Sequence, residues 1–205
     1  MFNTQEKKER SLGTKLFLKP HRCNSPKCVT IRRPQRPGLH GGKRRRGQPS
    51  EFSQQLKEKQ KIKFTYGIRD TQLELIFSAA AKNPGVTGQM IISYLERRLD
   101  NVVFRLGLAP SRSVGRQLVG HGHIMVNGRR VTIPSFRVKS GEVITIRPQS
   151  KEHPAFKDLA ITLKTYQPPV WLEMDKEKLE GKVVSLPKDF EIPFDVNLVV
   201  DYYNK

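Results

Sequence analysis

The chain has 205 residues, 36% of them hydrophobic, and carries 38 Lys and Arg against 19 Asp and Glu, a net charge of +19. This length suffices for one or two domains with a hydrophobic core. In a free globular protein, so many positive side chains repel one another and destabilise the compact state. When they neutralise the phosphates of a nucleic acid, counterions are released and binding is favoured. There is no apolar run of about 18 residues and no basic segment before a short apolar one, so we expect neither a membrane partner nor a secretory signal.

The basic residues are concentrated in the first 150 positions. Residues 1–50 hold fourteen Lys and Arg against two acids, a net charge of +12, and residues 51–150 hold sixteen against seven, a net charge of +9. Residues 151–205 hold eight against ten, a net charge of −2. Because contact with nucleic acid follows positive charge, we expect RNA contacts in the first two segments and protein contacts in the last.

Residues 1–49 are predicted to form an irregular basic arm. Pro and Gly recur between positions 20 and 49 and interrupt regular structure. The arm has few apolar residues to offset the entropy of ordering, so we expect it to become ordered on RNA, and residues 1–10 to be a disordered tail. The RNA-binding residues assigned to the arm are Arg32, Arg33, Arg36, Lys43, Arg44, Arg45 and Arg46.

Residues 50–97 predict a small helical bundle. Ser50 is a typical helix N-cap, and Gly67 is a typical helix end. The apolar residues that follow are spaced three and four apart and predict two more helices. The RNA-binding residues assigned to the first, basic helix are Lys59 and Lys61.

Residues 151–205 are grouped with the helical bundle into one helical and mixed domain. A helix is expected over residues 154–166. Short strands are expected at Val183-Val184 and Val199-Val200, because β-branched residues favour strands.

Residues 98–150 predict an ααβββ module, so the expected fold class is α+β. Apolar residues from Leu99 to Leu106 have the spacing of one buried helix face. Ser111 is positioned to cap a second helix. Arg112 and Arg116 lie about one turn apart on that helix and project from the same face.

The strands of the module are separated by two turns. Asn127-Gly128 is a strong hairpin signal, and Ser140-Gly141 is a second turn before the third strand. The RNA-binding residues assigned to the module are Arg98, Arg105, Arg112, Arg116, Gln117, His121, His123, Asn127, Arg129 and Arg130. We expect them to bind phosphates and to recognise RNA shape, with few base edges read.

Several segments resemble the bacterial-type family of ribosomal protein four of the small subunit. The resemblance is carried by RLDNVVFRLG at 98–107, RQLV at 116–119, HGHI at 121–124 and VNG at 126–128, and it extends to CNSPKC at 23–28. It implies a primary rRNA-binding protein that nucleates assembly of the 5′ domain. It also implies contact with neighbouring small-subunit proteins, especially protein five, at an interface linked to decoding accuracy. The implied location is a cytoplasmic ribosome, with an organelle ribosome as the alternative.

The sequence offers no catalytic pattern. It contains no serine elbow, no H-E-x-x-H motif and no phosphate-binding loop, so we expect no enzyme activity, no cofactor and no small-molecule substrate. Similar modules occur in pseudouridine synthases and tyrosyl-tRNA synthetases, but there they are appendages on large catalytic domains. An rRNA-modifying enzyme and a free RNA chaperone or translational repressor are the alternatives to a ribosomal structural protein.

Cys23 and Cys28 are the weak candidates for a metal site. They form a C-x4-C pair, whereas a structural zinc site usually has four ligands. Some members of the family that the chain resembles have a second cysteine pair upstream, where this chain has acidic residues near Glu6 and Glu9. The other possible ligands are His21 and His40. We expect two buried free thiols and no structural zinc.

Overall fold

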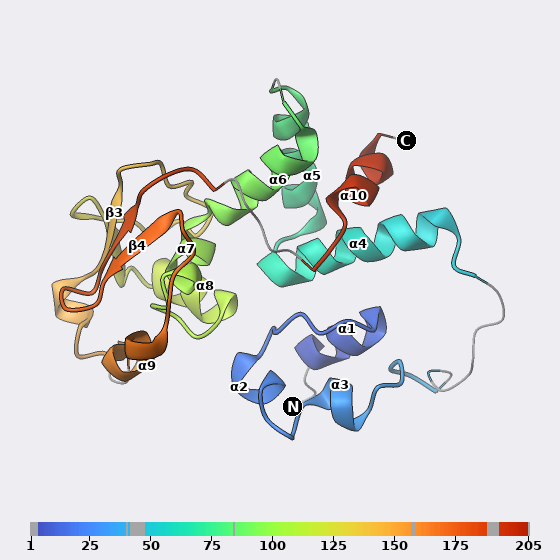
Figure 1. Ribbon diagram of the computed structural model, residues 1–205, viewed down its shortest axis with the longest axis horizontal. Helices are drawn as coiled ribbons and strands as arrows, with labels where there is room; N and C mark the ends of the chain where they lie inside the picture. Colours follow the sequence, from blue (N-terminus) through green and yellow to red (C-terminus); the bar gives the residue numbers. More distant parts are fainter. Residues whose placement is uncertain are drawn as a thin grey trace. The chain divides into compact units, whose positions relative to one another are not determined.

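The structure is a computed structural model, and it describes residues 4–39, 41, 48–83, 85–156, 159–187 and 193–204 (Figure 1). The chain forms two compact units. Unit 1 comprises Met1–Met90 and Glu191–Lys205, and unit 2 comprises Ile91–Phe190. The expected α+β class is confirmed, because the described part of unit 1 is helical and unit 2 combines helices with a sheet.

Helices make up the described part of unit 1. They are α1 (Thr4–Leu12), α2 (Pro20–Cys23), α3 (Val29–Arg32), α4 (Glu51–Tyr66), α5 (Asp70–Ala81) and α10 (Val196–Tyr203), while α6 (Thr87–Glu96) begins in unit 1 and ends in unit 2. The predicted ends of α4 are confirmed. Ser50 Oγ accepts a hydrogen bond from Ser53 N, and Gly67 ends the helix in the left-handed conformation. Helix α10 packs along α4 and also contacts α5.

Helix α10 corrects the strand that was expected at Val199-Val200. The Asp195 side chain accepts a hydrogen bond from Asn197 N and so caps the helix. Val199 is fully buried, and the Tyr203 ring stacks on Phe77 of α5 at a centroid distance of 4.8 Å. Tertiary packing on α4 and α5 therefore overrides the β preference of the two valines.

The N-terminal segment is folded where it is described, which corrects the expectation of an irregular arm. Glu9 of α1 is only 1% exposed, and its Oε1 accepts hydrogen bonds from Leu16 N and Leu18 N, each at 3.1 Å. Leu12 and Leu16 are buried as well. A carboxylate that accepts backbone N–H groups makes strong hydrogen bonds, so Glu9 organises the chain that follows α1.

We expect Glu9→Ala to loosen this segment, because Leu16 N and Leu18 N would lose a buried acceptor. The loss should be about 1–3 kcal/mol of local stability. Amide hydrogen exchange measures it directly, with faster exchange expected at Leu16 and Leu18. Glu74→Ala, at an exposed position of α5, is the matched control. Unchanged exchange in Glu9→Ala would contradict the assignment.

Unit 2 packs helices against one antiparallel sheet. Its elements after α6 are α7 (Leu99–Arg105), α8 (Arg112–Gly120), β1 (Ile124–Val126), β2 (Arg129–Arg130), β3 (Val143–Ile146), α9 (Leu159–Thr165), β4 (Leu172–Asp175) and β5 (Glu180–Val183), with single 3-10 turns at Pro148–Ser150 and Pro154–Phe156. The strand order is β2-β1-β3-β5-β4. The predicted buried face of α7 is confirmed, since Leu99, Val102, Val103 and Leu106 are each 0% exposed. The Asn127-Gly128 turn joins β1 to β2 as expected.

Strands β4 and β5 correct the predicted boundary at residue 150. β5 pairs with β3 in the register Ile144↔Gly181, and β4 pairs with β5. Trp171, Leu172 and Val183 belong to the same hydrophobic core as α7 and α8. Residues 151–190 are therefore part of unit 2 and do not join the helical bundle. The helix expected over 154–166 is a 3-10 turn followed by α9.

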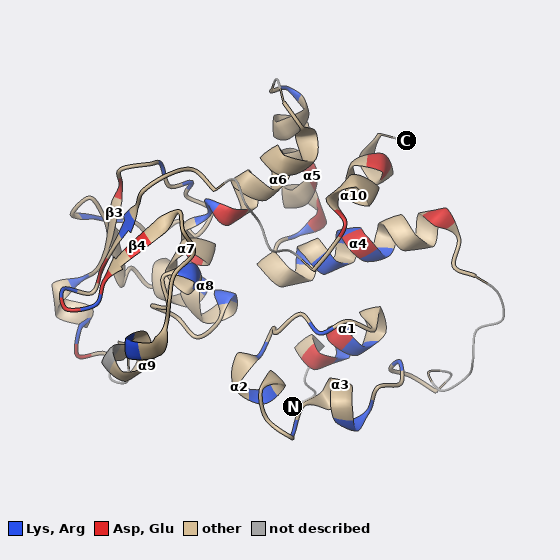
Figure 2. Ribbon diagram, viewed as in Figure 1, with Lys and Arg blue, Asp and Glu red and all other residues tan. Residues whose placement is uncertain are grey.

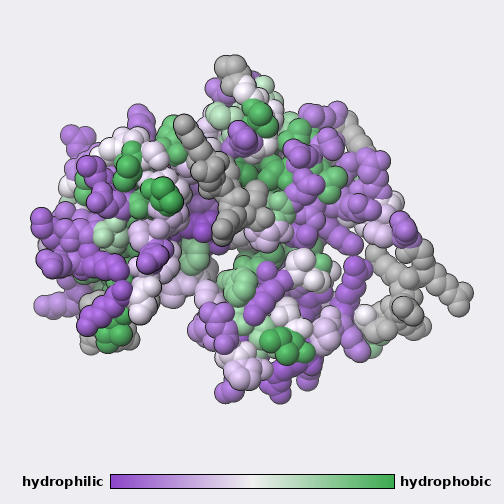
Figure 3. Space-filling view, viewed as in Figure 1, coloured by the Kyte–Doolittle hydropathy of each residue, from purple (hydrophilic) through white to green (hydrophobic). Residues whose placement is uncertain are grey.

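The visible surface is mainly hydrophilic, with smaller apolar areas (Figure 3). Val170 is 99% exposed and Val184 is 52% exposed. Val184 N donates a hydrogen bond to Trp171 O at 3.0 Å, so the two exposed valines lie on adjacent backbone segments. Within the described ranges, no helix is both long and apolar enough to cross a membrane.

Candidate nucleic-acid interface

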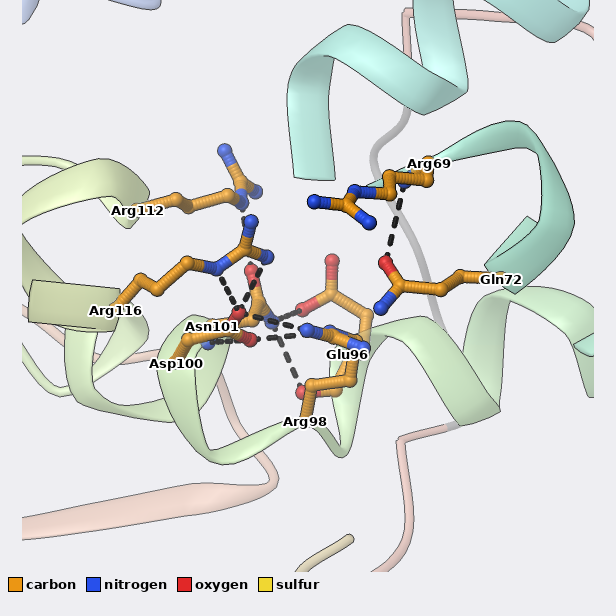
Figure 4. Close-up of polar contacts among 8 residues, drawn as sticks. All are labelled: Arg69, Gln72, Glu96, Arg98, Asp100, Asn101, Arg112 and Arg116. Carbon is orange, nitrogen blue, oxygen red and sulfur yellow. Dashed lines mark hydrogen bonds and ion pairs between the residues drawn. The ribbon is translucent and has the colours of Figure 1, made fainter. Parts of the chain in front are cut away.

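Helices α7 and α8 come unusually close together at Gly115 of α8. A Cβ atom at this position would lie 2.7 Å from the backbone oxygen of Asp100, which is closer than real contacts allow. The missing side chain therefore lets α8 lie against the start of α7. Arg112 and Arg116, on either side of Gly115, reach the polar residues of α7 as a result (Figure 4). Sequence reasoning missed this glycine, although a small residue between two arginines on one helix could have indicated a close helix contact.

Asp100 holds two arginines. Its side chain is 3% exposed, and it accepts hydrogen bonds from Arg98 Nε at 3.1 Å and Arg98 Nη2 at 2.8 Å. Arg116 Nε and Nη2 donate to Oδ2 of the same carboxylate at 3.0 Å and 2.7 Å (Figure 4). The buried negative charge is therefore compensated by charge-assisted hydrogen bonds, which makes its burial tolerable.

A second buried acid, Glu96, organises the other two arginines. Its carboxylate accepts from Arg105 Nε at 3.0 Å and Nη2 at 2.9 Å, a two-donor fork. Asn101 Nδ2 donates to Glu96 Oε2 at 2.8 Å, and Asn101 Oδ1 accepts from Arg112 Nε at 2.7 Å. The Arg112 guanidinium also lies over the Phe104 ring, 4.6 Å from its centroid. Glu96 and Asn101 thus fix two arginines that come from different helices.

The network leaves a cationic face with defined geometry. Four arginines balance two buried carboxylates, a net charge of +2 for the cluster. The Arg105 and Arg116 side chains are 28% and 36% exposed, so both reach the surface. Figure 2 shows basic residues on α8. The arginine fork matches phosphate oxygens, and such contacts commonly position a protein on nucleic acid.

Comparison with known proteins identifies the family. The family model described as "S4 domain" matches residues 97–144, which contain α7, α8 and the hairpin, and the "Ribosomal protein S4/S9 N-terminal domain" matches residues 3–96. The small ribosomal subunit protein uS4 of Halothermothrix orenii is 48% identical over 96% of this chain and 94% of its own length. The uS4 proteins of Pelotomaculum thermopropionicum and Thermus thermophilus are 46% and 45% identical over the same shares. The chain belongs to the uS4 family.

Membership of the uS4 family confirms the resemblance seen in the sequence. The family consists of structural proteins of the small ribosomal subunit and not of enzymes, so the expectation of no enzyme activity is confirmed. The expected location in the cytoplasmic ribosome also agrees with the family of these bacterial relatives. The S4 domain match coincides with the arginine cluster, which links the family to the geometry described above.

Arg98 does not lie on the surface where the sequence had placed it. The residue is 5% exposed, and its guanidinium faces Asp100, while its backbone forms an isolated bridge with Arg137. A carboxylate two residues further along the chain draws the side chain inward. Arg98 therefore compensates the buried charge of Asp100.

Lys59 and Lys61 are also turned to internal contacts, within unit 1. Lys59 Nζ donates to the Tyr202 hydroxyl at 3.1 Å, and its side chain is 12% exposed. Lys61 Nζ pairs with Glu58 at 2.6 Å, and its side chain is 14% exposed. Packing of α10 on α4 explains the change for Lys59, because Tyr202 belongs to α10. Helix α4 was expected to provide a basic RNA-binding surface, but Lys59 and Lys61 make contacts within unit 1 instead.

The remaining predicted residues are distributed as follows. Exposed positions are Arg32, Arg33, Gln117, His121, Asn127, Arg129 and Arg130, and half-buried ones are Arg36 and His123. Asn127 Oδ1 accepts from Val143 N at 2.9 Å, which makes it part of the turn. Lys43, Arg44, Arg45 and Arg46 lie outside the described residues. Whether each exposed residue contacts RNA stays a prediction.

His123 immediately precedes β1, and its backbone oxygen accepts a hydrogen bond from Arg147 N, the residue that follows β3. The side chain lies in a cluster of imidazole rings. Its Nδ1 is 2.9 Å from Ser150 Oγ, and its ring centroid is 4.7 Å from that of His153 and 6.0 Å from that of His121. Burial lowers the pKa of His123, and the charges of His153, His121, Arg130 and Arg147 lower it further. The folded state therefore binds a proton at His123 less readily than the unfolded chain does.

We expect this imidazole to make the protein acid-sensitive. Below the ordinary pKa of 6.5 the unfolded chain binds more protons at this position, so the free energy of unfolding falls as pH drops. Urea unfolding at about pH 7.5 and about pH 5.5 measures the difference, which should be smaller in His123→Gln. His21→Gln, at an exposed position of α2, is the control. An equal pH dependence in both variants would count against the role of His123.

Cys23 and Cys28 are both buried and free. Cys23 Sγ lies 3.9 Å and 4.0 Å from the two carboxylate oxygens of Glu9, and burial raises the pKa of its thiol. Zinc requires thiolates, but here a protonated thiol suits the neighbouring carboxylate. Glu9 Oε1 already accepts two backbone N–H groups. In the part of the chain that the structure describes, no three His, Cys, Asp or Glu side chains are placed to hold a metal ion.

Proposed function

We propose that the chain binds small-subunit rRNA directly through the α7–α8 face, as a primary binder that nucleates assembly of the 5′ domain. The observation that supports this proposal best is the set of arginines held by the buried carboxylates of Glu96 and Asp100. Membership of the uS4 family supports rRNA as the polyanion. The charge of +21 over residues 1–150, against −2 over the rest, supports a large phosphate surface.

RNA fits this face better than a protein partner does. Arg105, Arg112 and Arg116 present planar guanidinium groups, which bind phosphate oxygens with two donors. Their positions are fixed by the protein, so little side-chain entropy remains to be lost on binding. A rigid set of cations suits a folded RNA junction, whose phosphates have fixed positions, and recognition would then rest on backbone shape.

The direct test measures binding of the purified chain to small-subunit rRNA without any other protein. We expect saturable binding to the 5′ domain that weakens steeply as salt increases. An rRNA fragment that lacks the 5′ domain is the control and should bind far more weakly. A requirement for other ribosomal proteins, or equal affinity for both fragments, would contradict primary binding.

We propose further that the chain contacts ribosomal protein five and supports decoding accuracy through this contact. The family resemblance supports the partner, and the loss of positive charge after residue 150 supports a protein contact in this segment. The exposed apolar side chains of Val170 and Val184 suit contact with a protein surface better than contact with phosphates. Cross-linking in assembled subunits should join the two proteins, and Val184→Asp should reduce the yield if these side chains take part. Absence of any cross-link would contradict the contact.

For Cys23 and Cys28 we propose a structural role as buried thiols without zinc. Glu9 accepts hydrogen bonds from Leu16 N and Leu18 N and so supplies the ordering that a metal could otherwise provide. Elemental analysis of the purified protein should find no stoichiometric zinc. One zinc ion per chain would overturn this proposal.

A further inference from the structure

Asp100 has more partners than its burial requires. The Arg98 guanidinium alone donates to both carboxylate oxygens, and Asn101 N donates to Oδ1 at 2.9 Å. These contacts already compensate a buried acid. Arg116 nevertheless donates twice more to Oδ2, although more than a third of its side chain is exposed. The two extra bonds therefore serve the orientation of Arg116 more than the burial of Asp100.

An exposed arginine usually samples many rotamers, and this freedom is lost when it binds a phosphate. Two hydrogen bonds from Nε and Nη2 to one oxygen fix the plane of the Arg116 guanidinium before any ligand arrives. Gly115 contributes by letting α8 approach the Asp100 backbone. Asp100 and Gly115 together therefore fix the orientation of the Arg116 guanidinium.

We propose that Asp100 is a positioning residue for RNA binding, an acidic side chain that strengthens the affinity for a polyanion by orienting Arg116. The proposal rests on the proposed function, since it concerns the same face. It predicts the opposite of what net charge alone predicts for the affinity of an Asp100 variant for RNA. Removing a carboxylate raises the net charge of the protein by one, which by charge alone strengthens binding to RNA. Loss of orientation weakens it, so the two accounts predict opposite signs.

The first experiment compares Asp100→Asn with Glu177→Gln, an exposed acid in the β4–β5 turn. Both substitutions remove one negative charge. Affinity for the rRNA 5′ domain is measured at one salt concentration, at a temperature where circular dichroism shows both variants folded. Asp100→Asn should bind about three- to tenfold more weakly than the unmodified chain, the effect of ordering one rotamer-rich side chain. Glu177→Gln should bind equally or slightly more tightly. Tighter binding by Asp100→Asn would overturn the proposal.

A second variant keeps the proposal testable if Asp100→Asn does not fold. Arg116→Lys retains the positive charge and the Arg98–Asp100 pair, but an ammonium group cannot reproduce the Nε and Nη2 fork. We expect a loss of affinity similar to that in Asp100→Asn. Affinity equal to that of the unmodified chain would show that charge alone matters and would reject positioning.

A double-mutant cycle separates this proposal from a purely structural role of Asp100. In an Arg116→Gln background, Asp100→Asn should cause no further loss of affinity, because the residue it orients is gone. The same loss in both backgrounds would mean that Asp100 acts through the fold. If Arg116→Gln alone leaves affinity unchanged, the proposed RNA-binding face itself fails. If Arg116→Gln weakens binding and Asp100→Asn does not, only the positioning role fails.

Discussion

Replacing Arg112 and Arg116 together with glutamine should weaken binding to small-subunit rRNA by about a hundredfold or more at fixed salt. Each arginine is expected to contribute one charge-assisted phosphate contact of roughly 1.5 kcal/mol or more. The slope of log affinity against log salt should flatten by about 1.4–1.8, since each phosphate contact contributes roughly 0.7–0.9. Glutamine is preferable to glutamate, because a carboxylate at position 116 would be placed beside Asp100.

The matched control removes two positive charges elsewhere in unit 2. Lys176→Gln with Lys178→Gln changes the exposed β4–β5 turn and leaves α7 and α8 intact. This control should lose only the small affinity that comes from net charge. If the control and the arginine variant lose affinity to the same degree, the α7–α8 face is not the binding site.

Asp100→Ala should lower the free energy of unfolding by about 3–5 kcal/mol, the largest stability effect that we expect for a polar residue of unit 2. The substitution leaves Arg98, which is 5% exposed, with a buried positive charge and no carboxylate. It also removes the acceptor of Arg116 and of Asn101 N. Urea unfolding of the whole chain, followed by circular dichroism, measures the change.

A compensated variant tests the reason for this loss. Asp100→Leu combined with Arg98→Met removes the buried pair entirely, so no uncompensated charge remains, and much of the stability should return. A double variant as unstable as Asp100→Ala would show that the pair contributes more than charge compensation. A loss below about 1 kcal/mol in Asp100→Ala would contradict the burial of the pair.

Local signals in the sequence predicted the elements that carry the site. Ser111 as an N-cap, the apolar spacing of α7 and the Asn127-Gly128 turn are each decided by neighbouring residues. For this reason α7, α8 and the hairpin agree with the structure to within a residue or two. The shared direction of Arg112 and Arg116 follows from helix geometry in the same way.

Features that depend on residues far apart in the chain were not predictable in this manner. The pairing of β3 with β5 joins Ile144 to Gly181, and no local pattern encodes such a partner. The valines of α10 favour a strand until the contact with α4 and α5 is known. Sequence alone likewise could not decide which basic residues would turn to internal contacts, as Arg98 does toward the buried Asp100 and Lys59 toward the Tyr202 hydroxyl.

The N-terminal segment shows a different limit. Its composition, rich in Pro, Gly and Arg, indicated an arm without a core. Composition does not reveal that one acid, Glu9, can satisfy two backbone donors and so replace part of a missing apolar core. The available signal was that Glu9, one of only two acids in residues 1–50, lies close to Leu12 and Leu16.

Hydroxyl-radical cleavage from a tethered iron complex tests the central claim most directly. The probe is attached at Gln117→Cys on the exposed side of α8, and at Glu177→Cys in the β4–β5 turn as the reference, with Cys23 and Cys28 left buried. In the complex with small-subunit rRNA, the probe at position 117 should cleave a confined stretch of the 5′ domain. The probe at position 177 should cleave that stretch weakly or not at all. Absence of cleavage from position 117, with the complex intact, would contradict RNA binding by the α7–α8 face.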